Sequence, residues 1–350
     1  RNILKIKING KIIFNIITLL IPLGFIVYFL TSENGFIDLM ENAEKFNWWW
    51  IIAGITFQLL NVVTDAYILF KFTHNYDKNY TFVKSLKTTA VGQFFSVITP
   101  GAVGGQPMQL YCMKKQNIDT GVASSSLVQK FLVYQTTITF YSLISMLFNL
   151  NIFSGSMSGA MMSLAAFGFA SHALVIAFVF MFSFNKKLTT SIINSCFNFL
   201  AKIKIIKKPE EKADKVKIQL EYFHQSNKQL YKNKKMLILI CFFTIIQLTL
   251  IFAIPYTVYR AFNFYGANIF DMITGQAFVT MVSSFMPLPG GSGAAEGSFY
   301  VFFEMFFTPN TIKSAILVWR IITYFMNIVI FAPFARIGNI SETAKTLENI

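Results

Sequence analysis

Residues 99–110 read TPGAVGGQPMQL and residues 288–299 read LPGGSGAAEGSF, so a Pro/Gly-rich segment occurs twice in the chain. Each segment lies between hydrophobic stretches, and these flanks also match, at Gln58/Gln247, Tyr67/Tyr256, Lys71/Arg260, Ser124/Ser314, Lys130/Arg320 and Tyr134/Tyr324. Repeats that carry Gly/Pro breaks inside membrane-length apolar sequence are typical of transporters, whose binding site lies where the breaks meet. The repeat therefore predicts a transporter-like membrane protein with a site between its two breaks.

The composition of the chain excludes an ordinary water-soluble protein. Of its 350 residues, 54% are hydrophobic and 13% are charged, and the mean hydropathy is +0.53. Apolar windows of about 20 residues recur, and this is the length that spans a bilayer as a helix. The net charge is +14, but the lysines concentrate beside the apolar windows. There they set topology and contact anionic lipid, so we expect no nucleic-acid partner.

The chain carries no sequence pattern of an enzyme or of a metal site. Cys112, Cys196 and Cys241 are scattered, without the paired spacing of metal ligands. The sequence has no His-Glu-x-x-His, no Gly-x-Ser-x-Gly and no nucleotide-binding fingerprint, and its glycine-rich segments lack the Gly-Lys-Ser/Thr of a phosphate-binding loop. We therefore predict no catalytic residue, no metal and no cofactor.

The apolar windows and the charge bias predict two inverted repeats. We expect spanning helices at about 12–30, 47–70, 120–148, 158–184, 236–259 and 312–333, with a kink at Pro255. Basic residues before the first helix and acidic residues after it place the N-terminus in the cytoplasm, and six crossings return the C-terminus there. Short apolar pieces around each break predict re-entrant hairpins near 86–116 and 269–307, on opposite sides of the membrane.

The expected fold class is thus an all-α polytopic membrane protein of two inverted repeats, each with three spanning helices and one re-entrant hairpin. Residues 1–150 hold the first repeat, 151–184 the first helix of the second repeat, and 236–340 the remainder of the second repeat. Between them, 185–235 form a basic cytoplasmic segment with an amphipathic stretch at 188–203. This segment either sets orientation alone or binds anionic lipid headgroups.

Ionisable residues within membrane segments are costly, which makes them candidate functional residues. They are Asp65, Lys130, Glu296, Glu304 and Arg320. Lys130 and Arg320 are repeat-related, and each follows its break, so together they suit an anion such as a lipid phosphate. Glu296 is expected to balance a cation without substrate or to carry a coupling proton. The alternative is structural, with internal ion pairs Glu296–Arg320 and Asp65–Lys130.

The breaks supply further candidate substrate-binding residues, namely Gln106, Gly101, Gly104, Gly105, Gly290, Gly291 and Gly293. Main-chain N–H groups at the ends of broken helices favour an anion. Neutral polar side chains near the first break suit a path for a hydrated headgroup. The bland alternatives are tight turns and close helix packing for the glycines, and a hydrogen-bonded helix interface for the glutamines.

The two breaks resemble the transmembrane domain of the lysylphosphatidylglycerol synthase/flippase family. The resemblance rests on Thr99-Pro100-Gly101, Gly104-Gly105-Gln106 and the more specific Pro-Gly-Gly-x-Gly-x-x-Glu at 289–296, and it covers nearly the whole chain. It implies translocation of phosphatidylglycerol, or of its lysyl form, between the leaflets of the cytoplasmic membrane. The family's full-length synthases add a soluble transferase domain that this sequence does not contain, so we expect a flippase and not a lysyltransferase.

Two other functions stay open at this point. One is lysyl-lipid synthesis, either by this chain or with a partner that supplies the transferase domain. The other is transport of a polyprenyl phosphate, a glycolipid or a small solute. The expected partners are a membrane phospholipid and either a second copy of the chain or a separate transferase.

Overall fold

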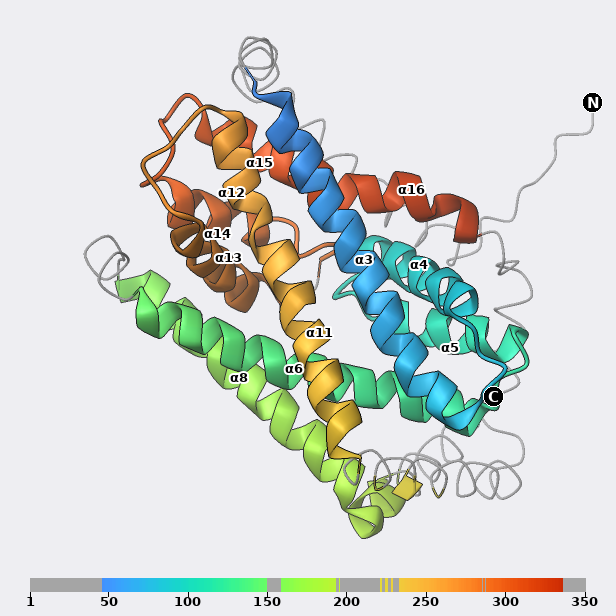
Figure 1. Cartoon of the computed structure of the whole chain (residues 1–350). Helices are drawn as coiled ribbons and strands as arrows, with labels where there is room; N and C mark the ends of the chain where they lie inside the picture. The colour runs from blue at the N-terminus through green and yellow to red at the C-terminus, as the bar shows by residue number, and fades with distance from the viewer. Residues whose placement is uncertain are drawn as a thin grey trace, which may run out of the picture.

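The computed structural model is built from helices, and the part of the chain that it describes contains no strand beyond an isolated bridge (Figure 1). The described residues are 46–149, 159–192 and 233–335, except 285 and 287, with a few single residues between 193 and 232. In chain order the helices are α3 (Trp48–Tyr76), α4 (Phe82–Ile98), α5 (Gly105–Lys115), α6 (Thr120–Phe148), α8 (Gly159–Phe184), α11 (Lys234–Phe252), α12 (Ile254–Ala261), α13 (Ile269–Ser283), α14 (Ala294–Phe303), α15 (Ile312–Arg320), the π-helical η1 (Ile321–Phe325) and α16 (Met326–Ala335).

Four helical segments are long and apolar enough to cross a membrane. They are Trp48–Tyr76, Thr120–Phe148, Lys234–Ala261 and Ile312–Phe334, at four of the predicted positions. A fifth candidate is a bent pair, Ala165–Met181 with Lys186–Ile192, in which the two helices meet at 100°. These spans confirm the predicted all-α polytopic membrane class. The predicted helix at 12–30, most of the basic segment and the C-terminal tail lie outside the described residues.

A kink was predicted at Pro255, and the helix is interrupted two residues earlier, at Ala253. Ala253 ends α11 and begins α12, in which Pro255 occupies the first turn. Proline lacks an N–H and clashes with the preceding turn, so it is tolerated at a helix start and not in a helix interior. The long apolar segment is therefore continuous in sequence, but its helix is interrupted just before its proline.

Several polar residues of α6 face inward, while several of its large apolar residues face outward. Ser125, Ser126 and Gln129 are fully buried, whereas Phe140 and Phe148 are exposed, Phe148 by 84%. A water-soluble helix shows the opposite arrangement. An apolar outer surface around a polar interior is what a lipid environment favours, because lipid tails solvate phenylalanine well and polar groups seek partners within the bundle.

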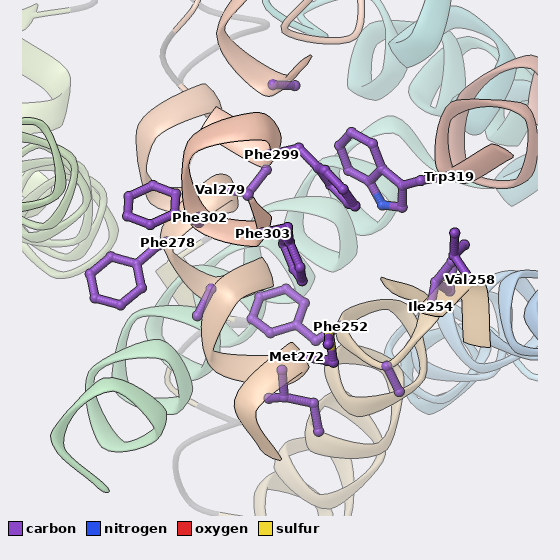
Figure 2. Close-up of a cluster of buried hydrophobic side chains, with 14 of the residues drawn as sticks. Phe252, Ile254, Val258, Met272, Phe278, Val279, Phe299, Phe302, Phe303 and Trp319 are labelled. Atoms are coloured by element: carbon purple, nitrogen blue, oxygen red, sulfur yellow. The ribbon is translucent and has the colours of Figure 1, made fainter. Parts of the chain in front are cut away.

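The largest hydrophobic cluster lies around α13 and α14 (Figure 2). Phe299 stacks on Phe303 with ring centroids 4.2 Å apart, and it also lies 4.8 Å from the ring of Trp319 in α15. Phe278 of α13 stacks on Phe302 at 4.8 Å. Such aromatic pairs contribute about 0.5–1.5 kcal/mol each beyond burial. The cluster fixes α14 against α13 and α15, and so fixes the start of α14, where the second break ends.

Two pairs of short helices interrupt the long ones. The pair α4–α5 is joined by residues 99–104, and the pair α13–α14 by residues 284–293. In Figure 1 they lie on opposite sides of the long helices α3 and α11. Each pair contains one of the Pro/Gly segments. Whether the pairs enter from opposite membrane faces, as the inverted-repeat hypothesis requires, stays a prediction.

Candidate functional site

The two Pro/Gly breaks meet in the structure. Pro100 and Pro289 form an isolated antiparallel backbone bridge, although they are far apart in sequence. A second link comes from Tyr324, whose hydroxyl donates a hydrogen bond of 3.3 Å to the carbonyl of Val97 at the end of α4. The sequence repeat predicted that the breaks would lie together, and this contact is present.

Glycine is required at matched positions of both breaks. Gly101 has φ +59° and Gly290 has φ +61°, values that side chains strongly disfavour. At Gly290 there is also no space, because an added Cβ would overlap the ring of Tyr324. The first residue after each proline therefore reverses the chain, and at the second break the chain does so directly against η1.

A cavity of about 810 Å³ lies where the breaks meet. Both break segments contribute to its wall, together with residues of α3, α6, α11, α13, α15, η1 and α16. The predicted site residues on this wall are Asp65, Gly101, Gly105, Gln106, Lys130, Gly290 and Arg320. The predicted residues outside the wall are Gly104, Gly291, Gly293 and Glu296. The structure thus brings both repeat-related cations to one cavity.

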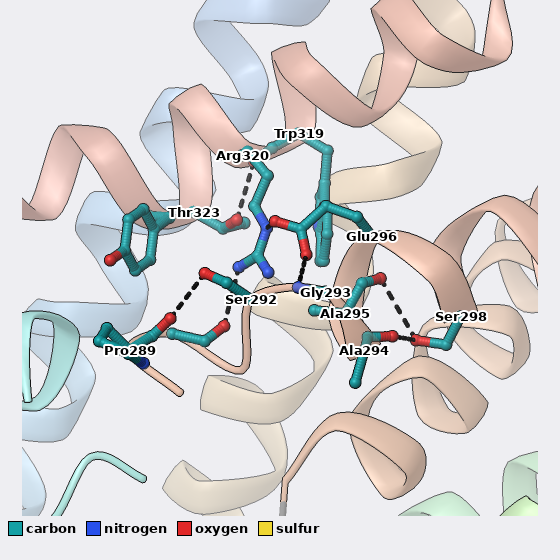
Figure 3. Close-up of polar contacts among 12 residues, drawn as sticks. Pro289, Ser292, Gly293, Ala294, Ala295, Glu296, Ser298, Trp319, Arg320 and Thr323 are labelled. Atoms are coloured by element: carbon teal, nitrogen blue, oxygen red, sulfur yellow. Dashed lines mark hydrogen bonds and ion pairs between the residues drawn. The ribbon is translucent and has the colours of Figure 1, made fainter. Parts of the chain in front are cut away.

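Arg320 holds the second break from the side of α15 (Figure 3). Its Nε lies 2.7 Å from Oε1 of Glu296, and both side chains are largely buried, with 9% and 12% of their area exposed. Its Nη1 donates a hydrogen bond of 3.0 Å to the carbonyl of Gly290. Arg320 therefore contacts both the glycine turn, at Gly290, and the following helix α14, at Glu296.

Glu296 reaches Arg320 because of its place in the first turn of α14. Its Oε2 accepts a hydrogen bond of 2.7 Å from the backbone N–H of Gly293, the residue before the helix. A carboxylate here satisfies a free N–H and interacts favourably with the positive end of the helix dipole. The spacing Gly-x-x-Glu thus fixes Glu296 as a cap whose other oxygen faces the arginine.

The α-helical hydrogen-bond pattern changes immediately after Arg320. Residues Ile321–Phe325 form the π-helical η1 before α16 resumes. Single π turns inside helices are uncommon and occur often at functional sites. Here the segment contains Thr323 and Tyr324, which line the cavity beside Arg320.

Lys130 forms the second ion pair of the cavity. Its Nζ lies 2.7 Å from Oδ2 of Asp65 in α3, and both side chains are largely buried. The other oxygen of Asp65 accepts a hydrogen bond of 3.2 Å from Gln247 in α11. Both ion pairs that the sequence offered as the structural alternative are therefore present, and in both the cation also lines the cavity.

One nitrogen of the Arg320 guanidinium group, Nη2, is buried and lacks a hydrogen-bond partner among the described residues. A buried guanidinium N–H without a partner costs free energy, and a phosphate oxygen is the acceptor that it suits best. The cavity can therefore bind an anionic group at Arg320 without breaking the pair with Glu296.

The sequence predicted a polar path near the first break, including Gln106, but it did not predict the carboxamide residues that other helices bring to the cavity wall. Carboxamide side chains dominate it: Gln58, Asn61, Gln93, Gln106, Gln109, Gln135, Gln247, Gln276 and Asn327. Gln58 and Gln247 occupy matched positions of the two repeats, which was a usable signal. A glutamine in an apolar helix either bonds to a neighbouring helix or faces a cavity, and helical periodicity alone does not separate the two.

The described residues contain no cluster of three or more His, Cys, Asp or Glu side chains that could hold a metal ion. The acidic residues at the cavity are the partners of Lys130 and Arg320. The chemistry of this site therefore rests on two paired cations, carboxamides and main-chain groups of the two breaks.

Comparison with known proteins agrees with this architecture. Residues 13–330 match the model of the family described as the lysylphosphatidylglycerol synthase TM region. The chain is also similar to a UPF0104 membrane protein of Archaeoglobus fulgidus, with 23% identity over 294 residues that cover 81% of this chain and 85% of the relative. Because the family match spans most of the 350 residues, the chain belongs to the lysylphosphatidylglycerol synthase transmembrane-region family of multi-pass membrane proteins.

Proposed function

We propose that this protein is a lipid translocase, which moves a phosphate-bearing lipid of the phosphatidylglycerol type between the two leaflets of the cytoplasmic membrane. One observation carries the proposal. The two broken helix pairs meet at a cavity of about 810 Å³ whose wall holds both repeat-related cations, Lys130 and Arg320. Sites at the meeting point of broken helices are typical of membrane transporters.

The headgroup occupies the cavity while the acyl chains stay in lipid. Arg320 donates its unused Nη2 to a phosphate oxygen and keeps its bond to the turn at Gly290. Lys130 exchanges Asp65 for the phosphate as the headgroup passes. Asp65 and Glu296 hold the two cations in place when no headgroup is bound, so neither charge is left alone at membrane depth.

Leaflet exchange in proteoliposomes tests the proposal. A fluorescent phosphatidylglycerol is incorporated in both leaflets, and the fraction accessible to an external quencher is followed with time. Removing one partner of a buried ion pair would destabilise the bundle, so the variants remove both: Asp65→Asn with Lys130→Gln, and Glu296→Gln with Arg320→Gln. Wild-type protein should accelerate exchange, and each double variant should abolish the acceleration.

A matched control removes an ion pair whose residues do not line the cavity. Lys186 and Glu221 form a pair of 2.8 Å whose side chains are 59% and 57% exposed, and Lys186→Gln with Glu221→Gln should leave exchange unchanged. Full exchange by both cavity double variants, with correct folding, would contradict the role assigned to Lys130 and Arg320.

A further inference from the structure

We infer that the headgroup carried in the cavity is uncharged apart from its phosphate and rich in hydroxyl groups, as a glycerol or sugar headgroup is, and that the site disfavours an aminoacyl headgroup. The inference rests on the proposed function, since it specifies the substrate class of the same cavity. It is carried by the carboxamide wall, by the pairing of every charge on that wall, and by four buried polar atoms without partners.

The wall is built mainly from groups that both donate and accept hydrogen bonds. Seven glutamines and two asparagines line the cavity, against three charged side chains, Asp65, Lys130 and Arg320. Each carboxamide offers an N–H₂ donor and a carbonyl acceptor, and a hydroxyl likewise donates and accepts. A headgroup with several hydroxyls can therefore bond to several of these side chains at once.

Two of the buried atoms without partners are acceptors. They are Oε1 of Gln58 and Oε1 of Gln276, in side chains that are 1% and 7% exposed. Both side chains line the cavity. Because the terminal torsion of a glutamine is soft, a small rotation turns either oxygen toward a bound headgroup.

The surrounding hydrogen bonds fix which end of each amide is the oxygen. Asn327 donates Nδ2 to the carbonyl of Thr323, so its Oδ1 faces Gln58, and Gln58 must present Nε2 to it. Thr280 donates its hydroxyl to the carbonyl of Gln276, so that hydroxyl accepts from Nε2 of the same glutamine. In both cases the oxygen is the end that lacks a partner.

The other two atoms are donors. Nη2 of Arg320 and Nε1 of Trp319 are buried without hydrogen-bond partners among the described residues, and both side chains line the cavity. A phosphate diester only accepts and satisfies the donors alone, whereas an ammonium group only donates and satisfies the acceptors alone. A phosphate with a hydroxylated substituent satisfies both sets.

The charges on the wall argue against an aminoacyl headgroup. Asp65 is paired with Lys130, and Glu296, the carboxylate next to the wall, is paired with Arg320. A lysyl headgroup would bring further cations beside Lys130 and Arg320 without a free carboxylate to meet them. Such a site costs free energy for a cation and not for a hydroxyl.

The test compares four fluorescent lipids with identical acyl chains in proteoliposomes that contain the wild-type chain. The headgroups are phosphatidylglycerol, a glucosyl phospholipid (phosphatidylglucose), lysylphosphatidylglycerol and phosphatidylethanolamine. We expect the glycerol or the glucosyl lipid, or both, to exchange about tenfold faster than the two amino lipids, the equivalent of one well-made buried hydrogen bond to the headgroup. Comparing the first two lipids shows whether the site prefers a glycerol or a sugar headgroup.

Substitution of a glutamine whose side-chain oxygen lacks a partner tests the role of the acceptors in headgroup selection. Gln276→Met keeps the shape but removes the acceptor, and it should slow the hydroxylated lipids several-fold more than the amino lipids. Gln129→Met is the matched control, because Gln129 is also buried but does not line the cavity. It should leave all four rates unchanged.

The outcomes separate the inference from the function on which it rests. Exchange of amino lipids as fast as hydroxylated ones overturns the inference and leaves the translocase intact. Equal slowing of all lipids by Gln276→Met also overturns it. Exchange of none of the four lipids overturns the proposed function itself.

Discussion

The two breaks share a sequence motif but are held in different ways. At the second break Arg320 bonds to Gly290, Glu296 caps Gly293, and the hydroxyl of Ser292 donates to the carbonyl of Pro289 at 2.7 Å. At the first break the N–H of Gly104 donates to the hydroxyl of Thr99 at 2.9 Å, and the turn itself is open to solvent.

The difference follows from the position of the acidic residue with which each cation is paired. In the register of the matched segments Glu296 aligns with Pro107, and Asp65 aligns with Ile254, so each half lacks the acid that the other uses. Lys130 consequently pairs with a long helix, and Arg320 with the short helix of its own break. The second break is therefore bonded directly to its repeat-related cation, Arg320, whereas Lys130 is paired outside the first break. The following predictions test this asymmetry.

The largest expected effect is that of Arg320→Ala. The substitution leaves the largely buried Glu296 without its cation and frees the carbonyl of Gly290, so it should lower the free energy of unfolding by about 3–5 kcal/mol. Lys130→Ala should cost less, about 1–3 kcal/mol, because it breaks the pair with Asp65, whereas Arg320→Ala breaks both the pair with Glu296 and the hydrogen bond to Gly290. Denaturant titration in detergent micelles measures both.

The control for this pair is Lys84→Ala, which removes a lysine that bonds to the exposed carbonyl of Asn79. Its effect should stay within about 0.5 kcal/mol. A larger loss of unfolding free energy for Lys130→Ala than for Arg320→Ala would contradict this asymmetry. It would show that Arg320 does not stabilise the second break more than Lys130 stabilises the first.

A smaller difference in unfolding free energy is expected between substitutions of Gly290 and Gly101. Gly290→Ala and Gly101→Ala both force a side chain into positive φ, at about 1–2 kcal/mol. Only Gly290→Ala also meets the ring of Tyr324, whereas the atom closest to a Cβ at Gly101 lies 3.9 Å away. Overlap adds about 1–3 kcal/mol. Equal unfolding free energies for the two variants would show that the turn of the second break moves freely.

The smallest expected effect is that of Tyr324→Phe. It removes the hydrogen bond from the hydroxyl to the carbonyl of Val97, the side-chain link between the two breaks. The loss should be about 0.5–1.5 kcal/mol. Hydrogen exchange should localise it at the end of α4, with faster exchange there than at the end of α13. Uniform protection along both helices would contradict the link.

Much of the fold could be predicted from the sequence because the signals are local. Apolar length predicted the spans that the structure describes, and the Pro/Gly segments predicted where the short helices end. The π-helical segment after Arg320 had no local signal. It arises where α15 packs against the second break, and such packing involves residues distant in sequence.

The candidate site was predicted only in part for the same reason. The few charges at membrane depth identified Lys130, Arg320 and their partners. The carboxamide wall depends on pairs such as Gln58 and Asn327, which are 269 residues apart in sequence and 3.0 Å apart in space. Sequence periodicity cannot show that these side chains share a cavity, because each lies on a helix whose rotation is set by its neighbours.

Chemical blocking of the cavity shows whether the headgroup passes between the two breaks. Gln106 is exposed and lines the cavity, while Val83 is 60% exposed on the same helix pair and lies outside the wall. Gln106→Cys or Val83→Cys is made with the three native cysteines replaced by alanine, and leaflet exchange of fluorescent phosphatidylglycerol is measured before and after a bulky polar thiol reagent. We predict that modification stops exchange for Gln106→Cys and leaves it unchanged for Val83→Cys. Undiminished exchange by fully modified Gln106→Cys would contradict the account, because the headgroup would then not pass through the cavity between the breaks.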